Sequence, residues 1–197
     1  MTRIIAGAAR GRRLTVPFGR ATRPTADRAR EGLFSTLESL TGTLSGARLL
    51  DLYAGSGAVG LEALSRGAAA VLMVDSDPDA TRVIRDNVEA LGLPGAQVRP
   101  NRVERLLAAP PDDGGFDIAF LDPPYELDDD SVRAVLRDAL AHGWLAGAAL
   151  VAVERATRGG AWAWPAGFEA ERSRRYGEAT LWYGHAGPSP AAPPTEV

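Results

Sequence analysis

The residues best suited to chemistry form the run Asp122-Pro123-Pro124-Tyr125, which directly follows the apolar stretch Phe116–Leu121. An apolar stretch of this length predicts a buried parallel strand, and open α/β sheets bind ligands at the carboxyl ends of such strands. The exocyclic amine of a nucleobase is a poor nucleophile, because its lone pair is delocalised into the ring. Asp122 and the Pro123 carbonyl can accept its N–H groups, the two prolines keep the loop rigid, and Tyr125 offers a stacking face. The run therefore predicts a catalytic loop for transfer to such an amine, although Asp-Pro pairs also occur in ordinary turns.

A second candidate site is the turn Asp51-Leu52-Tyr53-Ala54-Gly55-Ser56-Gly57-Ala58-Val59-Gly60, in which three glycines satisfy G-x-G-x-x-G. Glycines let the backbone approach a nucleotide closely, and the next helix presents unpaired N–H groups. A pyrophosphate would be repelled by Asp51, whereas the sulfonium and ammonium of S-adenosylmethionine suit it. Asp75 ends the next predicted strand and can accept both ribose hydroxyls. The turn favours S-adenosylmethionine as cofactor over NAD(P) or a turn that binds nothing.

The net charge of −3 is unevenly distributed along the chain. Residues 1–30 hold eight arginines and one acid, a net +7, and the remainder carries a net −10. A basic segment on an acidic body is typical of proteins that bind a polyanion, most often nucleic acid. A solvated tail with no partner would show the same distribution of charge. The residues that we expect to bind RNA are Arg3, Arg10, Arg12, Arg13, Arg20, Arg23 and Arg28.

The elements that must position these residues alternate along the chain. An N-terminal hairpin (3–6 and 13–16) and a helix (26–40) come first. The strands expected next are 48–52, 71–74, 97–99, 116–121, 148–153, 169–175 and 180–183, and the helices are 59–65, 78–91, 103–107 and 131–141. This alternation predicts a doubly wound, mostly parallel seven-stranded sheet, a Rossmann-like α/β fold with a basic hairpin extension. The predicted parts are an RNA-binding arm (1–24), a catalytic domain (25–186) and a disordered tail (187–197) rich in proline.

Composition excludes several other kinds of site. The 197 residues include no Cys and two His, which excludes a disulfide framework, a zinc-finger cage, a Cys nucleophile and an iron–sulfur site. No uncharged stretch reaches the ~20 apolar residues of a membrane span, and no signal peptide is visible. We expect a cytoplasmic monomer that uses no metal and touches no membrane.

Several runs together resemble a known family, the RsmD-type 16S rRNA guanine-N2 methyltransferases, which are class I S-adenosylmethionine-dependent enzymes. The glycine turn and Asp122-Pro-Pro-Tyr125 mark only the superfamily, whereas the arm and the Arg23-Pro24-Thr25 stretch point to this subgroup. The matching runs are Arg3-Ile-Ile-Ala-Gly7, Gly11-Arg-Arg-Leu14, Thr22-Arg-Pro-Thr25 with Asp27-Arg28, Asp51-Leu-Tyr-Ala-Gly-Ser-Gly57, Gly60-Leu-Glu-Ala-Leu-Ser-Arg-Gly67 and Asp122-Pro-Pro-Tyr125.

The resemblance implies a methyl transfer to N2 of a guanine in 16S rRNA, presented in an assembling small ribosomal subunit. It implies that the methionine side of the cofactor is lined by Asp51, Gly55 and Gly57, with Asp75 on the ribose, and that Tyr53 and Ala54 of the same turn also bind the cofactor. Asn101 and Arg102 border the adenine by the same resemblance. The chain departs from the family at Asp75, where the family often has Glu, and near Asn101, where the family often has an acidic residue.

Two other functions remain open from the residues alone. Asp-Pro-Pro-Tyr also serves N6-adenine methyltransferases, so the residues do not separate guanine from adenine. A non-catalytic RNA-binding assembly factor could retain the same fold, although the intact Asp122 and Tyr125 argue against it. An NAD-dependent oxidoreductase is disfavoured by Asp51.

Overall fold

The structure, a computed structural model, describes residues 2–17 and 24–188. Its helices are α1 (Pro24–Thr41), α2 (Ala58–Ser65), α3 (Pro78–Leu91), α4 (Val103–Leu107) and α5 (Asp129–Ala141), with a 3-10 turn at Thr157–Gly159. Its strands are β1 (Thr2–Arg3), β2 (Arg13–Leu14), β3 (Arg48–Leu52), β4 (Ala70–Asp75), β5 (Ala96–Pro100), β6 (Phe116–Leu121), β7 (Leu145–Ala156), β8 (Phe168–Tyr176) and β9 (Ala179–Ala186). Each predicted element is present.

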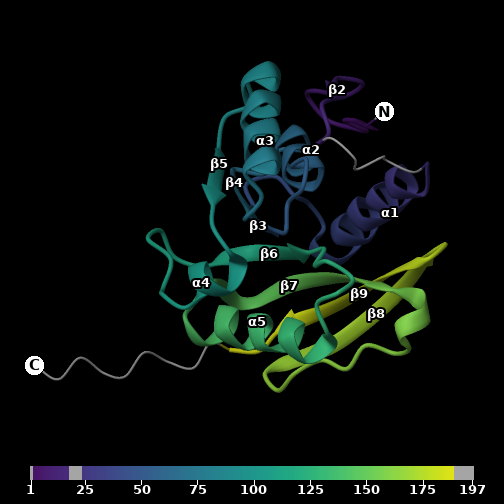
Figure 1. Cartoon of the computed structure of the whole chain (residues 1–197), viewed down its shortest axis with the longest axis vertical. Helices are drawn as coiled ribbons and strands as arrows, with labels where there is room; N and C mark the ends of the chain where they lie inside the picture. The colour runs from purple at the N-terminus through teal and green to yellow at the C-terminus, as the bar shows by residue number, and fades with distance from the viewer. Residues whose placement is uncertain (1, 18–23, 189–197) are drawn as a thin grey trace, which may run out of the picture.

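Seven strands form one sheet in the order β5-β4-β3-β6-β7-β9-β8. The first five strands run parallel, and β9 and β8 pair antiparallel at one edge (Figure 1). The predicted fold class, a doubly wound and mostly parallel sheet with a hairpin extension, is therefore confirmed. The order changes direction between β3 and β6, where open α/β sheets bind ligands.

Helices cover both faces of the sheet. Phe34 of α1, Leu61 of α2 and Ile84 of α3 are fully buried in one core, together with Phe120 of β6. The second core lies on the other face, where Val135 of α5 packs with strand residues that alternate with the first set. Side chains on successive strand residues point to opposite faces of the sheet. The core in which a strand residue is buried therefore shows the face to which the residues at the end of that strand point.

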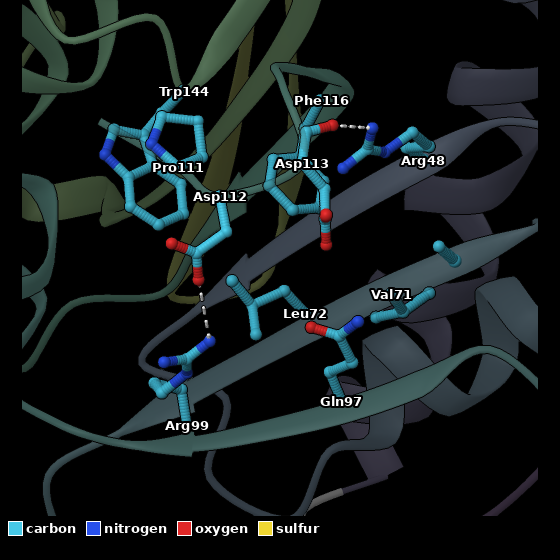
Figure 2. Close-up of a pocket in the computed structure, with 11 residues that line it drawn as sticks. Arg48, Val71, Leu72, Gln97, Arg99, Pro111, Asp112, Asp113, Phe116 and Trp144 are labelled. Carbon is cyan, nitrogen blue, oxygen red and sulfur yellow. Dashed lines mark hydrogen bonds and ion pairs between the residues drawn. The ribbon is translucent and has the colours of Figure 1, made fainter.

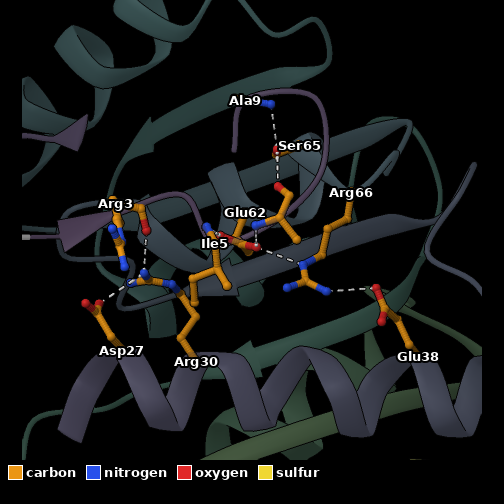
Figure 3. A network of polar contacts seen from close by, with 10 residues as sticks. Arg3, Ile5, Ala9, Asp27, Arg30, Glu38, Glu62, Ser65 and Arg66 are labelled. Atoms are coloured by element: carbon orange, nitrogen blue, oxygen red, sulfur yellow. Dashed lines mark hydrogen bonds and ion pairs between the residues drawn. The ribbon is translucent and has the colours of Figure 1, made fainter. Parts of the chain in front are cut away.

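The N-terminal arm packs against the body of the protein. Ile4, Ala9 and Leu14 are buried in the core beneath α1, α2 and α3. The carboxylate of Glu62, which has no exposed surface, accepts hydrogen bonds from the amides of Ile5 at 2.7 Å and Ala6 at 3.0 Å (Figure 3). These contacts hold the arm on α2 and supply the packing that two short strands alone lack in water.

The arm's strands are shorter than predicted. The strand ladder pairs Thr2 with Leu14 and Arg3 with Arg13, and Ile4 continues it by donating to the Arg12 carbonyl and accepting from the Gly11 amide, both at 2.9 Å. Ile5 and Ala6 cannot extend the ladder because Glu62 takes their N–H groups. The turn that follows rests on α2, where a Cβ on Gly7 would lie 1.8 Å from the Ser65 carbonyl oxygen. Glycine is therefore required at this close approach.

Other differences concern element ends. β7 begins at Leu145 and not at Ala148, because it pairs with β6 through an irregularity at which Ala148 adopts a φ of 63°. α5 begins at Asp129, because the side chain of Asp128 accepts the amide of Ser131 and caps the helix. The predicted tail lies outside the described residues from position 189 onward. No helix in the described part of the chain is long and apolar enough to cross a bilayer.

Candidate active site

Four acidic residues stand in a row at the carboxyl edge of the sheet. Asp75 ends β4, Asp51 lies near the end of β3, Asp122 follows β6, and Glu154 lies near the end of β7. The register pairs Asp51 with Phe120 and Leu121 with Val153, which brings Asp122 beside Glu154. By the alternation of side chains along each strand, all four point to the face of the sheet that α1, α2 and α3 cover. The sheet thus collects at one edge the carboxylates that the sequence separates by up to 103 positions.

Asp51 lies beneath the glycine turn, not on its surface. Its side chain is buried, and its Oδ2 accepts the Gly60 amide at 2.9 Å. Burial raises the pKa of Asp51 well above its ordinary value against the opposing hydrogen bond from Gly60, and the charges of Asp122 and Asp75 raise it further. The carboxylate therefore ties the first turn of α2 to β3 and lowers the potential beneath the turn.

The glycine turn has the conformation that the sequence predicts. Gly55 and Gly57 adopt positive φ angles of 60° and 74°, and Gly57 precedes α2 without any side-chain cap. A Cβ on Gly57 would lie 3.0 Å from the sulfur of Met73. An uncapped helix start at the carboxyl edge presents backbone N–H groups to an anionic group such as a carboxylate.

The side chain of Asp75 accepts hydrogen bonds from backbone amides at the same turn. Its Oδ2 accepts the Gly55 amide at 2.8 Å and its Oδ1 accepts the Asp77 amide at 2.9 Å. The Ala54 amide in turn donates to the Val74 carbonyl at 3.0 Å. Each carboxylate oxygen of Asp75 keeps a second lone pair, so acceptance of ribose hydroxyls stays a prediction.

The predicted adenine side is built by β3, β5 and α4. The Asn101 amide donates to the Asp75 carbonyl at 3.1 Å, which brings Asn101 next to the predicted ribose site. Tyr53, at a φ of 61°, donates its hydroxyl to Glu104 at 3.2 Å. Burial, and then the Glu104 charge, raise the pKa of this hydroxyl. Arg102 is exposed and lies 3.8 Å from Glu104, a residue that the sequence analysis missed.

The Asp-Pro-Pro-Tyr loop leaves β6 as predicted. Asp122 is exposed at the sheet edge, and its amide donates to the Leu52 carbonyl at 3.4 Å. Pro123 is buried, Pro124 is exposed, and Tyr125 is 66% exposed. A large aromatic side chain with so much free surface is available to stack on a planar ligand.

Glu154 is a further candidate that the sequence analysis missed. It is half-buried beside Asp122, and burial together with the Asp122 charge raises its pKa to about 8. The sequence shows a glutamate immediately after the apolar run 148–153. Only the adjacency of β6 and β7 shows that this glutamate lies next to Asp122. Perturbed carboxyl groups at a cleft edge are typical of functional sites.

The predicted RNA-binding arginines divide into three groups. Arg3, Arg10, Arg13 and Arg28 are exposed. Arg12 is also exposed, but its guanidinium donates at 2.5 Å to the Ala90 carbonyl near the end of α3, so it also fastens the arm. Arg20 and Arg23 lie outside the described residues.

One buried amide links the arm to the cofactor turn. Asn87 of α3 accepts the Thr15 amide at 2.8 Å and donates to the Thr15 carbonyl at 2.9 Å. The same nitrogen donates to the Ser56 carbonyl at 3.1 Å. One side chain, which the sequence analysis also missed, thus contacts both the arm and the glycine turn.

The hollows on the described part of the molecule include one at each edge of the sheet. One, of about 390 Å³, is at the opposite edge of the sheet, where Arg48, Arg99, Asp112, Phe116 and Trp144 line it (Figure 2). It lies at the strand starts, away from the row of carboxylates. The other, of about 460 Å³, lies beside the catalytic loop and includes Tyr125 and Trp162. The described residues include no cluster of side chains that could hold a metal ion.

Comparison with known proteins gives a consistent result. The sequence matches the family described as "Conserved hypothetical protein 95" over residues 2–185. It is 36% identical over 180 residues to "Ribosomal RNA small subunit methyltransferase D" of Escherichia coli K12, covering 89% of this chain and 85% of that protein. The protein of the same name from Haemophilus influenzae is 34% identical over 154 residues, 77% of each chain.

Solved structures agree with this fold. The structure of yhhF from Escherichia coli superimposes with a TM-score of 0.80 at 32% identity and covers 94% of this chain and 97% of its own. Magnesium protoporphyrin IX methyltransferase of Synechocystis, solved with S-adenosylmethionine, has a TM-score of 0.61 at 16% identity. The first likeness extends through the arm and the sheet, and the second shows a common fold.

Proposed function

This chain belongs to the family described as Conserved hypothetical protein 95, and on that premise we propose that it methylates N2 of a guanine in small-subunit (16S) ribosomal RNA with S-adenosylmethionine as donor. The membership confirms the resemblance to RsmD-type enzymes. The observation that carries the proposal is the position of Asp122. It follows the central strand β6, between the glycine turn after β3 and the end of β7, and it precedes the exposed Tyr125 by three residues.

The residues present fit the cofactor. The start of α2, where Gly57 makes no side-chain cap, suits the carboxylate of its methionine part, and the carboxyl groups of Asp51 and Asp75 beside the turn can accept from its ammonium and ribose hydroxyl donors. Tyr53, Ala54, Gly55 and Gly57 line the same turn, and Asn101 and Arg102 flank the adenine side in this proposal. When bound, S-adenosylmethionine supplies an electrophilic methyl group on a sulfonium.

The chain's own residues orient the acceptor. The target base lies against Tyr125, and its N2 amine donates to the Asp122 carboxylate and to the Pro123 carbonyl. Pro123 and Pro124 hold this loop in one conformation, so little freedom is lost when the base arrives. Asp122 accepts the proton that the amine loses as the new N–C bond forms and the C–S bond of the donor breaks, with adenosylhomocysteine as the leaving group.

The arm supplies the hold on RNA. We assign phosphate contacts to Arg3, Arg10, Arg12, Arg13, Arg20, Arg23 and Arg28, within an arm that spans residues 1–24, and catalysis to residues 25–186. The tail, 187–197, has no role in this proposal. The substrate is the assembling subunit, and the enzyme acts as a cytoplasmic monomer.

A methyl-transfer assay tests the proposal. Small subunits and naked rRNA from a strain that lacks this modification are incubated with labelled S-adenosylmethionine, and the product nucleoside is identified by mass. We expect N2-methylguanosine. N6-methyladenosine would instead indicate an adenine enzyme, and RNA binding without any transfer would indicate an assembly factor.

The variant Asp122→Asn tests the site. We expect transfer to fall by about 100-fold or more while adenosylhomocysteine binds with unchanged affinity. Asp86→Asn, which changes an exposed aspartate on α3, serves as control and keeps wild-type transfer. Full turnover by Asp122→Asn would remove Asp122 from the mechanism.

A further inference from the structure

Glu154 has no role in the mechanism derived so far, yet it adjoins the catalytic carboxylate. Val153 of β7 pairs with Leu121 of β6, so the next residues on the two parallel strands, Glu154 and Asp122, are neighbours. Both continue the face that carries Phe120 and Ala152. The two side chains therefore stand side by side at the edge where the target amine must arrive.

The surroundings of Glu154 leave its charge without compensation. Among the residues that the structure describes, none donates a hydrogen bond to its carboxyl group or forms an ion pair with it. The adjacent Arg155 instead binds Asp129 and the Leu127 carbonyl. The titratable groups that act on Glu154 are Asp122 on β6 and Tyr183 on β9, and neither is a cation.

A half-buried carboxyl group without a donor is destabilising, since its desolvation is not repaid within the protein. Burial and the Asp122 charge raise the pKa of Glu154 to about 8, so the empty site holds a proton there at neutral pH. A ligand that brings its own N–H group to this position would supply the missing partner and displace that proton to solvent.

Guanine has the matching arrangement of donors. Its N1–H and its N2 amine are adjacent on the Watson–Crick edge, whereas the amines of adenine and cytosine adjoin a ring nitrogen that only accepts. We propose that Glu154 accepts the N1–H of the target guanine while Asp122 holds N2, so that Glu154 determines the choice of base. This inference rests on the proposed function, because it assumes a base amine at Asp122.

The proposal predicts a specific dependence on pH. Glu154 must lose its proton before N1–H can donate to it, so kcat/KM for the RNA rises with pH, with an inflection near pH 8. The measurement is methyl transfer to small subunits lacking the modification, between about pH 6 and pH 9. The variants are Glu154→Gln, Glu154→Asp and, as control, Glu169→Gln, which changes an exposed glutamate on β8.

We expect Glu154→Gln to lower kcat/KM at pH 8 by about 10- to 100-fold and to remove the inflection, because an amide does not titrate there. Glu154→Asp should restore part of the rate and an inflection. Glu169→Gln should match the wild type, and all variants should bind adenosylhomocysteine equally. A Glu154→Gln variant with the wild-type rate and the wild-type inflection overturns the proposal. A Glu154→Gln variant with a lower kcat/KM that keeps the wild-type inflection also overturns it.

The two levels of the hypothesis fail differently. If the wild-type enzyme methylates no guanine in small subunits or rRNA, the proposed function is wrong. If it does so and the titration is independent of Glu154, only the assignment of Glu154 is wrong.

Discussion

Glu62→Ala tests whether the arm is held by a buried carboxylate. Glu62 has no exposed surface and accepts the amides of Ile5 and Ala6 as well as the Arg66 Nε at 2.8 Å. Arg66, with 12% of its side chain exposed, also reaches Glu38. Alanine leaves two part-buried N–H groups without their acceptor, and the Arg66 guanidinium keeps only its exposed partner, Glu38 (Figure 3).

The magnitude follows from these contacts. A hydrogen bond to a charged group contributes about 1.5–3 kcal/mol, and removing one partner of a buried ion pair costs about 3–5 kcal/mol. The terms share one side chain and do not add in full, so we expect the free energy of unfolding to fall by about 3–5 kcal/mol. At about 2–4 °C per kcal/mol for a chain of this size, Tm falls by about 6–20 °C.

The assay is urea unfolding followed by tryptophan fluorescence, with hydrogen exchange at the amides of Ile5 and Ala6. Glu38→Gln is the matched control, because Glu38 is 43% exposed and an exposed pair contributes about 0–1 kcal/mol. Exchange should accelerate at Ile5 and Ala6 in Glu62→Ala alone. If both variants lose the same small stability and keep protected amides, the carboxylate does not hold the arm.

Three further outcomes are expected. Arg10→Gln with Arg13→Gln should weaken RNA binding and reduce the slope of log K against log salt by about 0.7–0.9 per lost phosphate contact, with cofactor affinity unchanged in calorimetry; an unchanged slope would contradict the contacts. Gly57→Ala should lower stability by about 1–3 kcal/mol and weaken adenosylhomocysteine binding, because its φ is 74° and Met73 lies in the way of a Cβ; wild-type melting and affinity would argue against strain in the turn. Folded Glu154 keeps its proton up to about pH 8 while the unfolded chain releases it near the ordinary glutamate value, so unfolding titrations should show wild-type stability falling relative to Glu154→Gln across that window. A pH-independent difference would contradict the raised pKa.

The position of the Asp122-Pro-Pro-Tyr125 loop could be predicted because its signals are local. Phe116–Leu121 is apolar throughout, which indicates a strand buried on both faces, and Asp122 must then stand at its carboxyl end. The glycine turn is local in the same way. Glu154 could not be assigned, since its meaning depends on β7 lying next to β6, and the order of strands is not written in any single segment.

The supports of the arm could not be predicted for a related reason. Glu62, in the helical run from Val59 to Ser65, reads as an exposed charge, but it is fully buried because the arm covers it. Asn87 reads as a polar position on α3, yet it binds Thr15 and Ser56, 72 and 31 residues away. Arg12 is one of the predicted RNA contacts, and its guanidinium also donates a hydrogen bond to the Ala90 carbonyl. Side-chain contacts at such separations follow from the tertiary structure alone.

The spacing of these contacts also dictates when the first residues can fold. Every side chain that holds Ile5, Ala9 and Thr15 comes from position 62 or beyond. Closing such long loops costs entropy that only the finished surface of α2 and α3 can offset. The beginning of the chain therefore leaves the ribosome first and reaches its native place late, after the helices that receive it have assembled.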